Sequence, residues 1–229
     1  MIKIAGLPCL ARDSIILYGE NYPLASLNPK EQGDLEDNFN TLLGTSDSQI
    51  RKILEERLDT IVAGIMAIKT KLNREFRGMN PSDGELGFGF IRPEFVKAND
   101  AIINDWNVTL TGMGTWDRWL DKSATEGFTL SEEHGLIITH LVSQVTPAPF
   151  VRAVHFWVGR KELLPEPVDD ILLGDNANGI AVYPIPTKFI LPTAELRTTI
   201  TGVAGIEYLK LGGLVVGLGS RLKAETPSW

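Results

Sequence analysis

Aliphatic side chains recur at alternating spacings of four and three residues between residues 54 and 72. The stripe that they form consists of Leu54, Leu58, Ile61, Ile65, Ile68 and Leu72. This spacing places all of them on one face of an α-helix, as in the a and d positions of a heptad repeat. The pattern therefore predicts a helix whose apolar face is buried, either against copies of the same chain or against the rest of its own fold.

The residues around the stripe predict where its helix begins and ends. Ser46 and Gln49 have the spacing of a capping box, in which two side chains bond free backbone N–H groups at a helix start. Gly78 is a natural residue to follow the last turn of a helix. Upstream, an Asn-Pro pair predicts a first helix over residues 28–44, and the apolar run at residues 15–18 suits a single strand or an extended arm.

After residue 80 the sequence changes from charged and helical to rich in Gly, Pro, Thr and β-branched residues. Apolar and polar side chains alternate along residues 154–158 and 196–201, which is the period of a half-buried strand. Further strand candidates are residues 106–113, 136–145, 180–191 and 206–218. With Gly or Pro between them, about seven or eight strands fit between residues 86 and 222, as in a β-sandwich or barrel.

The two patterns together predict an α+β fold in which N-terminal helices, one of them long and heptad-patterned, precede an antiparallel β-sandwich that is jelly-roll-like. We place an N-terminal arm and helical oligomerisation region at residues 1–80 and the β-sandwich domain at residues 81–229. Proline pairs such as Pro184 and Pro186 are typical of edge strands or corners of a sheet, because proline has no N–H to donate. Gly212 and Gly213 indicate close packing or a tight bend.

Composition narrows the classes of function. The chain has 229 residues, of which 43% are hydrophobic and 22% are charged, as in an ordinary folded domain. Its net charge of −7 repels phosphate, so we expect no direct contact with nucleic acid. Cys9 is the single cysteine, and no apolar run suits a membrane span or a signal peptide. We therefore expect a protein made in the cytoplasm, and carried in a virion if it is a coat component.

Candidate catalytic groups are scattered. The three histidines, His134, His140 and His155, do not have the spacing of metal ligands, and no histidine lies near Cys9 in the sequence. The sequence also has no nucleophile elbow, phosphate-binding loop or dinucleotide fingerprint. We expect no catalytic activity, no cofactor and no metal site.

Three of the five tryptophans lie beside aspartates between residues 105 and 121. Aromatic faces flanked by carboxylates are a common way to hold sugars, because the ring meets apolar C–H groups and the acids bind hydroxyls. The candidate ligand-binding residues are Trp106, Trp116, Asp117, Trp119 and Asp121. The same tryptophans could instead anchor a core or a subunit interface, where Trp is also enriched.

The leading hypothesis is a self-associating structural protein. The mixed Ile and Leu stripe favours a trimer or a higher oligomer, with copies of the chain and other assembly proteins as partners. This architecture is similar to that of viral coat, spike and fibre proteins, and the likeness is one of fold class alone. The alternative is a carbohydrate- or receptor-binding module that meets a surface glycan through the Trp- and Asp-rich segment. The two hypotheses differ in whether the tryptophans are buried or exposed.

Overall fold

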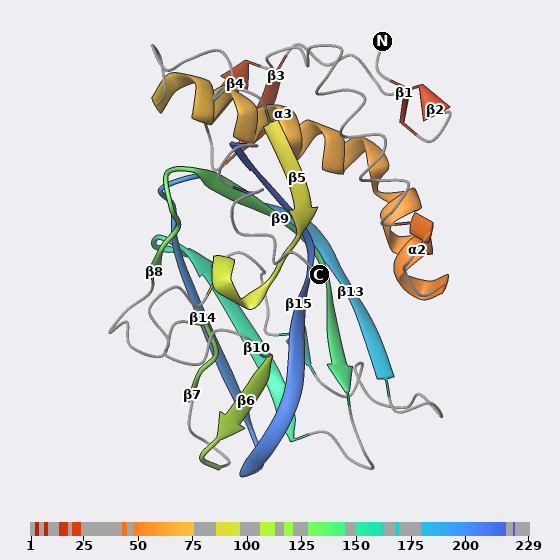
Figure 1. Ribbon diagram of the computed structural model, residues 1–229. Helices are drawn as coiled ribbons and strands as arrows, with labels where there is room; N and C mark the ends of the chain where they lie inside the picture. The colour runs from red at the N-terminus through yellow and green to blue at the C-terminus, as the bar shows by residue number, and fades with distance from the viewer. Residues whose placement is uncertain are drawn as a thin grey trace.

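The computed structural model of the chain describes residues 3–4, 7–8, 14–17, 20–23, 43–44, 48–75, 86–96, 106–112, 117–120, 128–144, 150–162, 168–169, 180–218 and 222. This part of the protein consists of antiparallel sheets with few helices (Figure 1). Two larger sheets form a sandwich, and the helices α2 and α3 lie over one of them. No helix within these ranges is long and apolar enough to cross a membrane.

The first sheet is the one that the helices cover. Its strands are, in spatial order, β13 (Ile180–Ile190), β9 (His134–Gln144), β15 (Gly205–Leu218) and β5 (Leu86–Phe90). Strand β6 (Asn107–Leu110) also pairs with β15, at the end that β5 does not reach. The short 3-10 helix η1 (Pro93–Phe95) follows β5.

The second sheet forms the other half of the sandwich. Its strands are, in spatial order, β11 (Lys161–Glu162), β10 (Val151–Val158), β14 (Glu195–Gly202) and β7 (Asp117–Arg118). Two short strands complete it: β12 (Val168–Asp169), which pairs with β10, and β8 (Phe128–Thr129), which pairs with β14.

Strand pairing across the two sheets is nested. The outermost pair in the sequence is β5 with β15, followed by β7 and β8 with β14, then β9 with β13, and β10 with β11 and β12. Each successive pair lies in the other sheet. The first half of this part of the chain therefore runs antiparallel to the second half, and their paired strands alternate between the two sheets.

Side chains from both sheets fill the space between them. On β14 every second residue is buried, including Leu196 and Ile200, and on β10 Val154 and Phe156 are buried whereas Ala153, His155 and Trp157 are less so. The alternation predicted for residues 154–158 and 196–201 is therefore confirmed. The strand candidates in the other four segments are also strands, although β6 is shorter than predicted. Strand β5, with the sequence LGFGF, was not singled out, because its glycines hide the alternation.

The predicted long helix is interrupted at Arg57. Helix α2 (Ser48–Glu56) and helix α3 (Leu58–Glu75) meet there in a turn, where the Arg57 N–H donates to the Leu54 carbonyl at 3.3 Å. The Arg57 guanidinium donates to the Thr139 carbonyl at 2.9 Å and to the Ile185 carbonyl. The prediction of one continuous helix is wrong at Arg57, where the backbone forms a turn and the side chain reaches two strands of the sheet below.

The sheet is itself irregular where Arg57 meets it. Strand β9 has one extra residue, Thr139, between His140, which pairs with Gly212, and Ile138, which pairs with Gly213. Gly213 has a φ of +147°, and a Cβ there would lie 1.9 Å from the Ile137 carbonyl oxygen. A side chain could not be accommodated at that position. Of the two roles predicted for these glycines, close packing is the one that the structure shows.

Strand β13 is an edge strand of the first sheet, and its pairing with β9 shifts between Pro184 and Lys188. The edge position predicted for Pro184 and Pro186 is therefore confirmed. Near the N-terminus, two short hairpins are formed by β1 (Lys3–Ile4) with β2 (Leu7–Pro8) and by β3 (Ser14–Leu17) with β4 (Glu20–Pro23). The apolar run at 15–18 thus overlaps one strand of a hairpin.

Some predictions fall on residues outside the described ranges. The first helix, predicted over 28–44, is described only at Leu43 and Gly44, which are helical. The boundary between residues 80 and 81, Ser46, Gly78 and Cys9 all lie outside these ranges.

Candidate functional site

The expected oligomerisation seam is covered by the chain's own first sheet. Each residue of the stripe is at most 4% exposed in the single chain: Leu54, Leu58, Ile61, Ile65, Ile68 and Leu72. They pack with apolar side chains of β5, β9, β13 and β15, which include Phe88, Ile137, Phe189, Leu214 and Val216. Two burial partners were predicted for the stripe, copies of the chain or the rest of its own fold, and the structure shows the second. Its assignment to an intermolecular interface is corrected accordingly.

Close approach between helix and sheet supports this correction. A Cβ at Gly64 of α3 would lie 2.5 Å from the Phe189 ring, and a Cβ at Gly135 of β9 would lie 2.9 Å from the Ile68 side chain. Real Cβ atoms are not found at such distances, so each glycine makes room for a side chain of the other layer. The two layers are fitted to one another, as expected of a permanent core.

Two of the candidate sugar-binding tryptophans are inaccessible. Trp106 and Trp119 are buried between the two sheets, and the Trp119 ring lies edge-on to Phe156 with ring centroids 5.8 Å apart. They cannot offer a ring face to a ligand, so their assignment to ligand binding is wrong. Trp116 and Asp121 lie outside the described residues, and Asp117 is described only by its backbone in β7.

The three histidines lie apart. His134 is at the start of β9, edge-on to Phe95 at 5.2 Å, and burial lowers its pKa from the ordinary value. His155 is on the outer face of the second sheet, edge-on to Trp157 at 4.7 Å, and the Arg197 guanidinium lies 4.4 Å from the centre of that tryptophan ring. Within the described ranges, no three His, Cys, Asp or Glu side chains are grouped so that they could hold a metal ion.

The turn between β14 and β15 presents apolar side chains to solvent. Ile206 is 64% exposed and Val203 is 38% exposed, and with Phe90 at the end of β5 they are the large hydrophobic residues found exposed in the described part of the chain. Single exposed aliphatic residues are common on protein surfaces. Here two of them lie at the tight connection from β14 in the second sheet to β15 in the first, which we call the inter-sheet turn (residues 202–206).

The inter-sheet turn is held in place by Phe150. The Val203 N–H donates to the Phe150 carbonyl at 2.8 Å. A Cβ at Gly202 would lie 1.9 Å from that carbonyl oxygen, and a Cβ at Gly205 would lie 2.3 Å from the Phe150 ring. The two glycines therefore let the turn close on Phe150, which fixes the position of Val203 and Ile206.

A buried carboxylate fixes Phe150 in turn. Glu207 is only 3% exposed and accepts hydrogen bonds from the backbone N–H groups of Phe150 and Val151, both at 2.7 Å. The Ser143 hydroxyl donates a third. Burying a carboxylate is costly unless donors surround it, and charge-assisted bonds are stronger than neutral ones. Glu207 therefore joins the first sheet firmly to the start of β10 in the second.

Glu207 and Ile206 were not among the predicted site residues, although the sequence contains a signal for them. Leu209 and Leu211 fix which face of β15 points inward, and that phase places Glu207 inside and Ile206 outside. On a half-buried strand the aliphatic side chains usually face the core and the charged ones face solvent, and Ile206 and Glu207 do the opposite.

No protein-family model, curated protein or solved structure matches the chain. What the protein does therefore has to follow from its own residues, which means the strand pairing, the inter-sheet turn and the buried polar groups.

Proposed function

We propose that the protein is a self-associating structural subunit of the coat type, with a place in a virion. The observation that carries the proposal is the inter-sheet turn, where a buried carboxylate and two glycines hold exposed aliphatic side chains in a fixed position. Leaving one large aliphatic side chain in water forgoes about 1.5–3 kcal/mol of burial. A rigid apolar contact also loses little entropy when it binds. Both facts favour burial of this contact against a partner, and the partner that we propose is a second copy of the chain.

The nested strand pairing supports the same proposal. We infer that the sandwich is a jelly roll, because its strands pair first with last and fold over two sheets in this way. Jelly rolls occur in viral coat proteins, in lectins and in cupins, so the topology narrows the function without deciding it.

Packing between the sheets favours the coat-type subunit over the other two classes. A cupin-type or internal ligand site needs space between the sheets, and in the described residues this space holds a continuous apolar core. A sugar site of the expected kind needs accessible tryptophans, and Trp106 and Trp119 belong to that core. The expectation of a trimer or larger oligomer rested on the stripe, so the present proposal is of self-association without a stated copy number.

Light scattering coupled to size-exclusion chromatography tests the proposal on the full chain over a series of concentrations. We expect the wild-type mass to rise with concentration, and the double variant Val203→Asp, Ile206→Asp to stay monomeric. Thr60→Asp, on the exposed side of α3, is the matched control and should associate like the wild type. Circular dichroism and thermal unfolding of each variant verify that the fold is kept.

A wild-type chain that remains a monomer at every concentration, with no ordered particles in electron micrographs, would overturn the proposal. If the double variant associated like the wild type, the inter-sheet turn would not be the contact between copies.

A further inference from the structure

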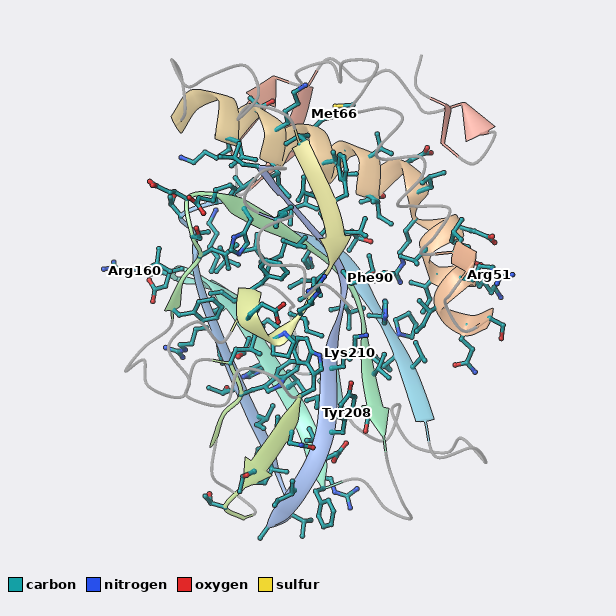
Figure 2. The ribbon with its side chains drawn as sticks, in the orientation of Figure 1. Arg51, Met66, Phe90, Arg160, Tyr208 and Lys210 are labelled. Carbon is teal, nitrogen blue, oxygen red and sulfur yellow. The ribbon has the colours of Figure 1, made fainter. Side chains whose placement is uncertain are left out.

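Three basic side chains gather on the outer face of the first sheet, beside the turn between α2 and α3. His140 on β9 pairs with Gly212 on β15, and Lys210 lies two residues before Gly212 on the same face of that strand. Arg57 comes from the helix turn and donates to the carbonyl of Thr139, the neighbour of His140. Lys210 follows Tyr208 along β15 (Figure 2). We call Arg57, His140 and Lys210 the basic cluster.

Geometry holds the imidazole in place. A Cβ at Gly212 would lie 2.1 Å from His140 Nε2, so the ring lies directly over that glycine and a larger residue would displace it. The Thr139 hydroxyl and His140 Nδ1 are 2.8 Å apart and hydrogen-bonded. With Nδ1 engaged, Nε2 is the nitrogen of His140 that is left for a ligand.

The surroundings of the cluster disfavour its positive charges. His140 is 5% exposed, and its pKa is lowered to about 4 by burial first and then by the positive charges of Lys210 and Arg57. Burial also lowers the pKa of Lys210. For Arg57, burial lowers the pKa, and the negative charge of Glu56 opposes this change.

Acidic partners are lacking within the described part of the chain. Glu56 is the acid whose charge acts on Arg57, but it lies on the exposed side of α2 and pairs with Lys52 at 3.8 Å. No ion pair there joins a carboxylate to Lys210, His140 or Arg57. This is unexpected in a chain with 29 acidic and 22 basic residues. The positive charges of Lys210 and Arg57 are partly buried, and such charge is costly to keep when it lacks a counter-charge.

We propose that the basic cluster binds an oxyanion, either a carboxylate or a phosphate group. A guanidinium, an ammonium and an imidazole offer N–H donors to anionic oxygens, and charge-assisted hydrogen bonds are short and strong. The bound anion would supply the counter-charge that the described residues do not. The site does not depend on self-association, because all three groups come from one chain.

The first experiment follows the imidazole signals of the full-length protein by NMR while sodium phosphate or sodium acetate is added. Sodium chloride keeps the ionic strength constant, so that general screening does not change. We expect a saturable shift of the His140 signal, and no saturable shift of His134 or His155, the other two histidines. Tighter binding of phosphate than of acetate would identify a phosphate ligand, and tighter binding of acetate would identify a carboxylate ligand.

Variants locate the site. Lys210→Gln should weaken binding about tenfold or more, because it removes a charge-assisted contact. Lys52→Gln, at an exposed lysine of α2, is the matched control and should bind like the wild type. If Lys210→Gln does not fold, Lys210→Met keeps the apolar stem of the side chain and replaces it in the assay.

The absence of any saturable shift at His140 with either anion would overturn the proposal. Equal affinity in the wild type and the Lys210 variant would overturn it as well, because binding would then lie elsewhere.

Discussion

Replacing Ile65 by alanine should destabilise the entire fold, because this side chain lies in the layer where α3 meets the first sheet. Ile65 is fully buried in the single chain, in the middle of the apolar stripe. Truncating a buried isoleucine to alanine costs about 2–5 kcal/mol, through lost burial and the cavity that remains. A native domain is stable by only about 5–15 kcal/mol. The substitution therefore removes a large share of the free energy of unfolding.

The size of this effect can be converted into a melting temperature. For chains of about 150–250 residues, 1 kcal/mol shifts Tm by about 2–4 °C. A loss of about 3 kcal/mol should thus lower Tm by about 6–12 °C. Thr60→Ala, at an exposed position on the same helix, is the control and should change the free energy of unfolding by less than about 0.5 kcal/mol.

The assay is urea unfolding followed by circular dichroism. It is best made on the Val203→Asp, Ile206→Asp variant, which we expect to be monomeric, so that association does not contribute to stability. Helix and sheet signals should disappear together at a lower urea concentration when Ile65 is replaced. If the monomer kept its free energy of unfolding after Ile65→Ala, the stripe would have to be exposed in the monomer, and its burial against the first sheet would be refuted.

Two further predictions concern buried polar groups. Glu207→Gln should lower the free energy of unfolding by about 3 kcal/mol, because an amide cannot accept all the bonds that the carboxylate accepts, whereas Glu195→Gln at an exposed site should change it little; equal urea midpoints for the two variants would contradict this role. His140 has a folded pKa of about 4, below its ordinary value of 6.5, so the unfolded chain binds the extra proton between these pH values and stability falls as the pH drops from 6.5 to 4. The wild type should lose about 3 kcal/mol more over this interval than His140→Gln, and parallel pH profiles of unfolding would count against it.

Local sequence predicts the strands well and the helix break poorly. The strands with regular alternation could be predicted because burial of one face imposes a period of two. The turn at Arg57 could not be predicted, because the residues around it favour a helix. At this turn the Arg57 side chain donates to a pair of carbonyl groups 82 and 128 residues away in the sequence. Only the folded sheet brings those acceptors to the guanidinium.

The sequence also leaves open which surface packs against the stripe. A helix with one apolar face has the same sequence pattern whether it covers a sheet or another helix, so the pattern predicts burial without identifying the partner. Gly64 is informative only once Phe189 is known to lie opposite it. The basic cluster was not predictable either, because it depends on the register of β9 against β15. The reversed phase of Ile206 and Glu207 could have been found from the sequence.

One irregularity explains how the first sheet carries both the helix layer and the basic cluster. The extra residue Thr139 changes the phase of β9. His140, after it, and Ile137, before it, therefore both lie on the outer face of the sheet, where Ile137 packs against the helices. At this point the helices also break, and Arg57 donates to the Thr139 carbonyl. The irregularity of the sheet and the break between the helices thus meet at the Thr139 carbonyl. Beyond it, the outer face changes from the apolar side chains that seat α3 to the polar face that bears Lys210.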